Sequence, residues 1–193
     1  TIDLLEDSTP AVDITPNGAS RVYEAGLPTG SDPGDSKTTT GTLHITTGGD
    51  TLASLTINGV DVTSGGTVDG LHGTLTVSLS DGVYSYSYTL TGTTTDAPDA
   101  AETDSFNVIV TDSDGDPADA TLTIEIVDDV PSAADDSATQ ATENASITID
   151  VMANDTRGAD GVDLVTGVSH TSPMNGVNAA SGTLTYHDDG TFT

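Results

Sequence analysis

Two alternating segments around an acidic turn constrain the fold of this chain more than any other feature. In Ser105–Thr111 and Ala120–Val127, apolar side chains occupy every second position. This period of two is typical of β-strands that bury one face, and the turn Asp112–Asp116 between them predicts a hairpin. The second segment runs into the acidic pair Asp128-Asp129 and a proline. A hairpin is stable only beside further strands, so we expect a larger sheet around it.

The same alternation recurs along most of the chain. It predicts further strands at Ala11–Thr15, Gly41–Thr46, Leu52–Ile57, Gly73–Leu79, Val83–Leu90, Ser146–Met152, Leu164–Val168 and Gly182–Tyr186. Turn residues such as Asn58-Gly59 and Asp81-Gly82 separate several of these segments. No window shows sustained helical periodicity, and the abundant Thr and Val favour a pleated surface. We therefore predict an all-β fold.

Three tyrosines, Tyr84, Tyr86 and Tyr88, lie on one face of the predicted strand Val83–Leu90. A row of tyrosines could bind a sugar, but the opposite face of the strand is mostly serine. With 4% aromatic residues and no tryptophan in the chain, we favour the interpretation that the row is the core face of a thin sheet.

The charge balance is extreme, with 31 acidic residues against three basic ones, Arg21, Lys37 and Arg157. A net charge of −28 argues against nucleic acid and anionic membranes as partners. Salt and water can screen the carboxylates, or divalent cations can bind them. The chain contains no cysteine that could form a disulfide and no apolar run long enough to span a membrane.

The sequence indicates two domains joined in tandem. Glu6-Asp7 and Asp128-Asp129 each precede a proline within a few residues, which is typical of linkers. We assign 1–7 to the end of a linker, 8–130 to a first domain and 131–193 to a second. Gly182–Thr193 resembles Gly73–Tyr86, yet the second domain has no counterpart of the hairpin after it. We expect this domain to be incomplete, either truncated, completed by other strands or split by an inserted domain.

The acidic turn of the opening hairpin is a candidate cation site. Asp112, Asp114 and Asp116 alternate around Ser113 and Gly115, which resembles the first half of an EF-hand loop. No glutamate follows at the twelfth position and no helices flank the turn. Asp and Gly are also ordinary turn residues, so a turn without metal is the alternative.

A second candidate cation site lies at the boundary of the two domains. Strand directions place the hairpin tip at the far end of the first domain and bring Asn154-Asp155 beside Asp135-Asp136. The carboxylates expected to converge at the boundary are Glu24, Asp104, Asp128, Asp129, Asp136 and Asp155. So many oxygen donors without a basic residue predict a bound Ca²⁺, and a flexible, solvated linker is the alternative.

Catalytic constellations are absent from the sequence. The four histidines are dispersed without metal-ligand spacing, and no serine lies in a nucleophile-elbow pattern. A glycosidase cleft would need aromatic platforms that this composition does not provide. We expect a protein that is not an enzyme.

The motifs resemble two families of repeat. Glu24–Pro28, Leu52–Leu90 and Asp104–Pro131 are similar to repeat domains of large RTX-type bacterial adhesins that are secreted by the type I pathway. Ser137–Thr156 with Gly182–Thr193 is similar to the first part of a cadherin-like or VCBS-type repeat. These resemblances imply immunoglobulin-like or cadherin-like β-sandwiches in tandem, with Ca²⁺ at their junctions, on the surface of Gram-negative bacteria.

We therefore expect a calcium-rigidified extender segment of a cell-surface adhesin, which projects a distal ligand-binding module. Its partners would be adjacent domains of the same chain, with a possible ligand-binding domain inserted after residue 193, and we expect a monomer. The alternative function is a glycan-binding or protein-binding module that uses the tyrosine row or the loop Thr29–Ser36. A third alternative is an accessory β-domain of a secreted hydrolase.

Overall fold

The computed structural model describes residues 8–94, 102–143, 145–166 and 184–193, and its regular structure is almost entirely β. The all-β prediction is confirmed. The chain divides into two compact units. The first comprises Thr1–Pro28 and Asp32–Asp128, and the second comprises Thr29–Ser31 and Asp129–Thr193. Within the described ranges, no helix is long and apolar enough to cross a bilayer.

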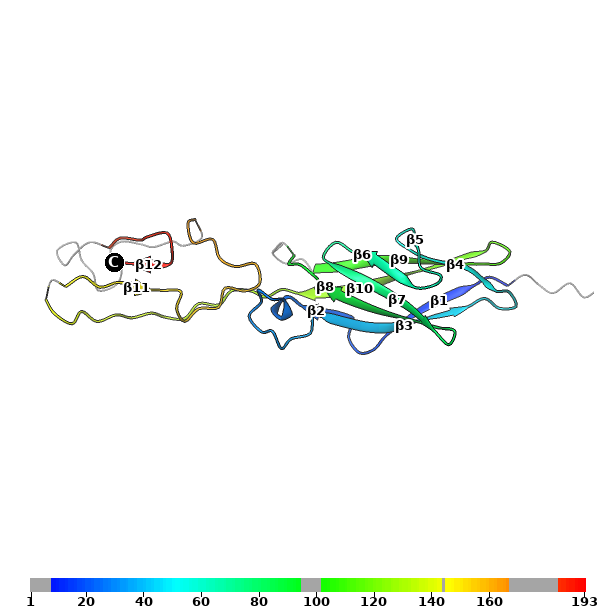
Figure 1. Cartoon of the computed structure of the whole chain (residues 1–193), viewed down its shortest axis with the longest axis horizontal. Helices are drawn as coiled ribbons and strands as arrows, with labels where there is room; N and C mark the ends of the chain where they lie inside the picture. Colours follow the sequence, from blue (N-terminus) through cyan, green and yellow to red (C-terminus); the bar gives the residue numbers. More distant parts are fainter. Residues whose placement is uncertain (1–7, 95–101, 144, 167–183) are drawn as a thin grey trace, which may run out of the picture. The chain divides into compact units, whose positions relative to one another are not determined.

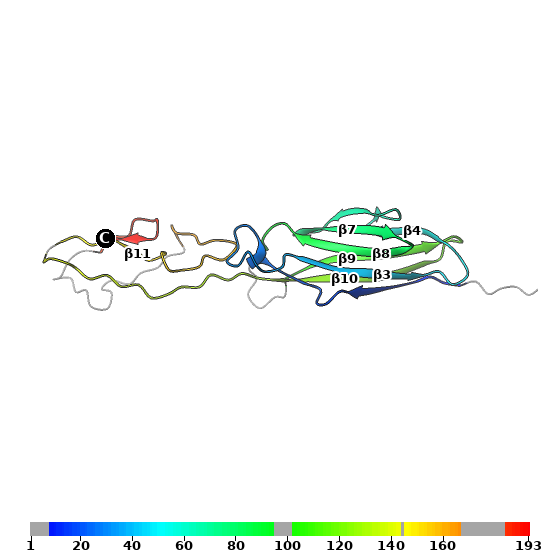
Figure 2. The same ribbon diagram turned by 60° about the horizontal axis from the view of Figure 1, so that its bottom comes forward.

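The first unit contains two five-stranded sheets, which form two layers (Figure 1) (Figure 2). The β8 sheet has the order β1 (Ala11–Pro16), β3 (Thr38–Thr46), β8 (Val83–Leu90), β7 (Gly73–Ser80) and β6 (Gly66–Asp69). The β9 sheet has the order β2 (Arg21–Tyr23), β10 (Pro117–Val127), β9 (Glu102–Asp112), β4 (Leu52–Ile57) and β5 (Val60–Asp61). All neighbouring strands are antiparallel except β2 and β10, which are parallel.

The core of the first unit lies between these sheets. Alternation along β8 turns Tyr84, Tyr86 and Tyr88 inward, and they are only 7%, 2% and 0% exposed. Tyr88 meets Phe106 of β9 edge to face, with ring centroids 5.9 Å apart. This contact joins the two layers, because β8 and β9 belong to different sheets. The interpretation of the tyrosine row as a core face is confirmed.

Two glycines make room for these rings. A Cβ atom on Gly41 would lie 2.5 Å from the ring of Tyr86, and one on Gly73 would lie 2.4 Å from the ring of Tyr88. Real Cβ atoms do not come so close to other heavy atoms. Large side chains on β8 therefore pack against bare backbone on both neighbouring strands, β3 and β7.

The predicted turns between strands are present. Asn58 and Gly59 have φ values of 49° and 79° between β4 and β5, and Asp81 and Gly82 have 51° and 80° between β7 and β8. Two consecutive residues with positive φ suit the twist of a tight hairpin. All predicted strands of the first unit are confirmed, β4 and β8 with the predicted ends. The short strands β2, β5 and β6 were not predicted.

The described part of the second unit contains much less sheet than the first unit. Among its described residues, β11 (Ile149–Asp150) pairs with β12 (Thr191–Phe192), and Ser132 forms an isolated bridge with Thr156. The predicted strand Ser146–Met152 is therefore too long, because only its centre finds a partner.

Two further strand predictions for the second unit are corrected. In Leu164–Val168, residues 164–166 form a turn because Asp163 Oδ1 accepts hydrogen bonds from the backbone N–H groups of Val165 and Thr166, at 2.9 and 3.1 Å. In Gly182–Tyr186, the described residues 184–186 contain only the isolated bridge of Tyr186 to Phe192. Residues 167–183 lie outside the described residues.

The similarity between Gly73–Tyr86 and Gly182–Thr193 corresponds to a hairpin in each unit. In the second unit, Thr185 and Thr193 exchange backbone hydrogen bonds of 2.8 and 2.9 Å around a turn in which Asp188 has a φ of 60°. Tyr186 and Phe192 stack across this hairpin with ring centroids 4.7 Å apart. Phe192 is 4% exposed and forms the centre of a small core.

Candidate metal centre

Three carboxylates from two loops meet at one end of the first unit. Asp112 ends β9, Asp114 lies in the loop between β9 and β10, and Asp50 lies in the loop between β3 and β4. One oxygen from each lies within 4.8 Å of the others. The loops meet because β4 pairs with β9, which places Leu52 opposite Asp112. This acidic cluster could hold a metal ion.

Asp112 is the buried member of the cluster, with 1% exposure. Its Oδ1 accepts hydrogen bonds from the backbone N–H groups of Gly115 and Asp116, at 3.2 and 2.8 Å, so the carboxylate shapes the hairpin loop. Its Oδ2 is buried and has no hydrogen-bond partner. A buried carboxylate oxygen is costly to leave unsatisfied, and a cation is a partner that would satisfy it.

Asp50 is held in place by its own loop. The side chain of Thr47 donates to the backbone oxygen of Asp50 at 2.7 Å, and the backbone N–H of Asp50 donates to the oxygen of Thr47 at 3.0 Å. Ser8 Oγ donates to Asp50 Oδ2 at 3.0 Å. The loop therefore holds this carboxylate near Asp112 without help from a cation.

No basic side chain of the first unit offsets the charge of this cluster. Arg21 forms the only ion pair found among the described residues, with Glu125. Lys37 precedes β3, at the end of that strand away from Asp50, and Arg157 belongs to the second unit. Carboxylates with oxygen atoms no more than 4.8 Å apart repel each other. A divalent cation would reverse the sign of this interaction.

The opposite end of the first unit also gathers acidic groups. Glu24 opens a 3-10 helix, Glu24–Gly26, and is fully buried. Its Oε1 accepts from the backbone N–H and the hydroxyl of Thr94, at 2.5 and 2.7 Å, while its Oε2 is buried without a hydrogen-bond partner. An oxygen of Asp128 lies within 4.8 Å of one of Glu24. The predicted proximity of Glu24 and Asp128 is present.

Glu102, the first residue of β9, adds a further carboxylate beside Thr94. The Thr94 hydroxyl contacts both Glu24 Oε1 and Glu102 Oε2. A hydroxyl has one proton and can donate to only one of the two carboxylates, so the other is short of a donor. Since Glu102 and Asp112 are the two ends of β9, the acidic groups lie at opposite ends of one 11-residue strand.

Asp104 has a structural role that the sequence interpretation missed. It is 1% exposed, and its oxygens accept from the backbone N–H groups of Leu71 and His72 and from the Tyr88 hydroxyl, at 2.8, 3.0 and 2.7 Å. Burial, and then the bond to Asp104, raises the pKa of Tyr88. Among the described residues, Asp104 belongs to no group of three metal-ligating side chains. It fastens the turn before β7 to β9.

Asp116 also contributes differently from the prediction. Its backbone N–H donates to Asp112 Oδ1, but its carboxylate is not part of the cluster of Asp50, Asp112 and Asp114. Asp50 takes the third position instead. The sequence signal for Asp50 was the acidic turn Thr47–Asp50, which becomes informative only once β4 is paired with β9.

The predicted ligands in the second unit have partners of their own. Asp129 accepts hydrogen bonds from the backbone N–H of Ser31 at 2.7 Å and from its hydroxyl. Asp155 Oδ1 accepts from the backbone N–H of Ala134 at 2.7 Å. The side chain of Asn154 donates to the oxygen of Asp135 at 3.2 Å, so the expected approach of these two segments is confirmed.

Asp136 and Asp155 line one open cavity of about 490 Å³ in the second unit, together with the apolar side chains of Val151, Met152 and Val162. The boundary site as a whole would combine Asp136 and Asp155 with residues of the first unit. That combination stays a prediction.

Comparison with known proteins adds no relative to this picture. No protein-family model, no curated protein and no solved structure matches the chain. The resemblance to adhesin repeats therefore rests on the motifs in the sequence alone. What stands from the structure is an all-β chain whose first unit presents carboxylates at both ends. Those of Asp50, Asp112 and Asp114 could hold a metal ion.

Proposed function

We propose that the chain is a non-catalytic extender segment of a bacterial cell-surface adhesin, and that Ca²⁺ bound by Asp50, Asp112 and Asp114 stiffens it. The observation that carries this proposal is the buried Oδ2 of Asp112, which has no hydrogen-bond partner and belongs to a cluster of three carboxylates without a base. Folding such a cluster without a cation costs repulsion and desolvation together.

The donor set favours Ca²⁺ over other common cations. It consists of oxygen atoms from carboxylates on two loops, with loop backbone nearby, and contains no histidine or sulfur ligand. Ca²⁺ accepts such irregular oxygen sets, whereas Mg²⁺ demands a tighter octahedron and Zn²⁺ prefers nitrogen and sulfur. Asp114 is exposed, so water can complete the coordination shell.

The extender role draws support from the placement of the acidic groups. One group lies at the end of the first unit where β9 finishes, and Glu24, Glu102 and Asp128 lie where β9 starts. A domain with acidic groups at both ends suits a chain of domains, in which a cation bound at each end would fix that end. The sequence motifs shared with adhesin repeats supply the link to the cell surface.

The strand order supports the immunoglobulin-like type of sandwich. In such domains the first strand lies beside the second in one sheet, and in the other sheet the last two strands pair with each other beside the third. Here β1 lies in the β8 sheet, β2 lies in the β9 sheet, and β10, β9 and β4 are neighbours in that order. The alternative of sugar binding by the tyrosine row loses its basis, because all three rings are buried.

Calcium binding to the full chain tests the proposal. We expect millimolar Ca²⁺ to raise the melting temperature by about 5–10 °C relative to chelator, if the free ion exceeds its dissociation constant about a hundredfold. Asp112→Asn keeps the shape of the side chain and removes its charge, so it should abolish most of this shift. Calorimetric titration should show the same loss of binding.

Asp119→Asn is the matched control, since Asp119 is exposed on β10 and outside the cluster. This variant should keep the full shift. Equal melting temperatures in chelator and calcium for the unaltered chain would refute the proposal. Small-angle scattering of the same samples tests the stiffening, which should appear as a longer maximum dimension with calcium.

A further inference from the structure

We propose that the parallel pair of β2 and β10 is a mechanical clamp, which resists unfolding when the first unit is pulled by its two ends. The inference rests on the proposed extender role for its biological use, because a tethered chain is pulled. Its mechanics follow from strand direction and contacts within the first unit.

The two terminal strands enter and leave at opposite ends of the first unit. Ala11, the first residue of β1, pairs with Thr46, the last residue of β3. β10 finishes at Val127, and the neighbouring Ile126 pairs with Glu102, where β9 starts. A pulling force therefore acts along the strands, with β1 and β2 drawn toward one end and β10 toward the other.

β2 and β10 connect these opposed strands directly. Arg21 pairs with Glu125, Val22 with Ile126 and Tyr23 with Val127, in parallel register. Bonds between parallel strands lie across the pulling direction, so the force loads all of them at once. A hairpin pulled apart at its open end loses its bonds one after another, which needs less force. β2 is short and forms few hydrogen bonds, but it can still resist a large force because these bonds are loaded together.

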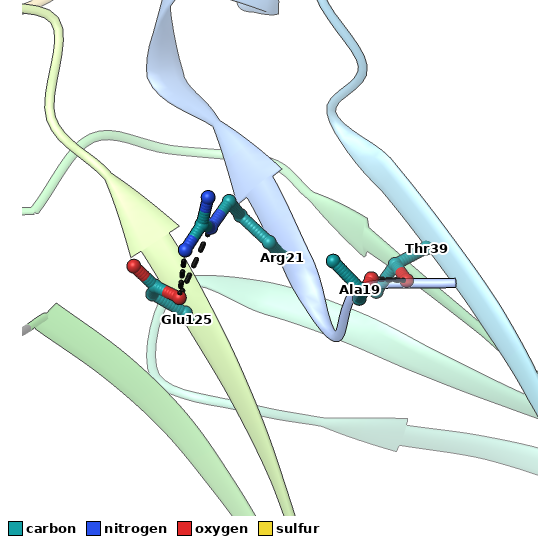
Figure 3. Close-up of polar contacts among 4 residues, drawn as sticks. All are labelled: Ala19, Arg21, Thr39 and Glu125. Atoms are coloured by element: carbon teal, nitrogen blue, oxygen red, sulfur yellow. Dashed lines mark hydrogen bonds and ion pairs between the residues drawn. The ribbon is translucent and has the colours of Figure 1, made fainter. Parts of the chain in front are cut away.

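A side-chain ion pair reinforces the same register position. Arg21 Nε and Nη2 both donate to Glu125 Oε2, at 3.0 and 2.8 Å (Figure 3). The bond to Glu125 raises the pKa of Arg21, which stays charged under all physiological conditions. Sequence reasoning gave no role to Arg21, one of the three basic residues in the chain. The structure places it at the first pair of the clamp.

The crossover between β1 and β2 is fastened to both sheets. Thr39 Oγ1 of β3 donates to the backbone oxygen of Ala19 at 3.0 Å (Figure 3). The backbone N–H of Asn17 donates to the oxygen of Thr40 at 2.8 Å, and that of Glu125 donates to Ser20 at 2.8 Å. A force that acts on β1 is therefore transmitted to both β3 and β10, and it does not separate β2 from β10 one bond at a time.

Single-molecule pulling on the full chain tests the clamp, and the absence of cysteine allows attachment at chosen sites. Handles at Ala11→Cys and Val130→Cys load β1, β2 and β10. In chelator, we expect Arg21→Ala to raise the rate of unfolding at constant force about two- to fivefold. Tyr84→Phe is the matched control, because it removes a hydrogen bond to the oxygen of Thr63 that lies outside the clamp.

A second pulling geometry uses handles at Val60→Cys and Ser80→Cys. β5 and β2 are opposite edges of the β9 sheet, so this geometry loads neither β2 nor β10 first. Arg21→Ala should then leave the first unfolding force unchanged. Two results would overturn the clamp. One is an equal change in unfolding for Arg21→Ala and Tyr84→Phe with the terminal handles. The other is an equal change for Arg21→Ala with both pairs of handles. A missing calcium effect on melting would overturn only the proposed function.

Discussion

The two units contain related hairpins but surround them with very different amounts of sheet. In the first unit, β7 and β8 pair over eight residues between further strands on both sides, and the rings of β8 are buried. Among the described residues of the second unit, β12 pairs with only two residues of β11, and the ring contact of Tyr186 with Phe192 forms the centre of the core. Similar local sequence thus yields a long or a short strand according to the partners available.

This difference separates what local sequence decides from what neighbours decide. The turn residues produce a tight reversal in both places, with Asp81 and Asp188 both at positive φ. Strand length, however, requires hydrogen-bond partners, and an isolated pair of strands is only marginally stable. We therefore expect the first unit to resist local opening much better than the second.

The largest effect should come from Phe192→Ala in the second unit. The substitution removes the ring that packs on Tyr186, and truncating a buried Phe costs about 3–5 kcal/mol. Such a small core has little stability to spare. Native-state amide hydrogen exchange should show loss of protection at Ile149, Thr185 and Thr193, while the amides of β9 and β10 stay protected. Retained protection in the second unit would mean that its stability comes from elsewhere.

A smaller global effect is expected from Gly73→Ala in the first unit. Its Cβ would lie 2.4 Å from the ring of Tyr88 and 2.5 Å from the backbone oxygen of Thr89, so the hairpin must shift. Overpacking of this kind costs about 1–3 kcal/mol, measured as a lower denaturant midpoint of the first unit. Gly92→Ala is the control, because nothing lies within 4 Å of its Cβ position. Equal denaturant midpoints for Gly73→Ala and Gly92→Ala would show that β7 can shift to accommodate the added methyl group without loss of stability.

Sequence reasoning found the long strands of the first unit because alternation and turn residues agree there. β4 and β8 were predicted with the correct ends. The strands β2, β5 and β6 have two to four residues, too few for alternation to be recognised. In the second unit, the same alternation predicted strands that are too long. A period of two shows that a segment can form a strand, but it does not show whether a partner strand is available.

The candidate site shows the same limit. Asp112 and Asp114 were predicted because they are neighbours in the sequence. Asp50 reaches them only through the pairing of β4 with β9, which is a long-range property. Asp104 was assigned to the correct end of β9, but the alternation that buries Phe106 also turns Asp104 inward, toward the Tyr88 hydroxyl. Asp104 and Phe106 are two residues apart, so the alternation of side chains along β9 predicts that both face inward.

The pair of Tyr88 and Asp104 gives the smallest and most specific prediction. At neutral pH, Tyr88→Phe should cost about 1–2 kcal/mol, because Asp104 Oδ2 loses a buried donor. Burial and Asp104 raise the pKa of Tyr88 above its ordinary value of 10.0, so the native state favours the protonated phenol. The resulting stability is fully present below pH 10 and is lost as pH rises beyond it.

The unfolding free energies of the unaltered chain and Tyr88→Phe should therefore converge above pH 10, in denaturant titrations of the first unit. Burial also raises the pKa values of Tyr84 and Tyr86, but both proteins contain these residues, so the difference between the proteins isolates Tyr88. A constant difference across this pH range would show that the phenol of Tyr88 ionises as readily in the folded first unit as in the unfolded chain. The burial that distinguishes the first unit from the second would then have no electrostatic consequence at this position.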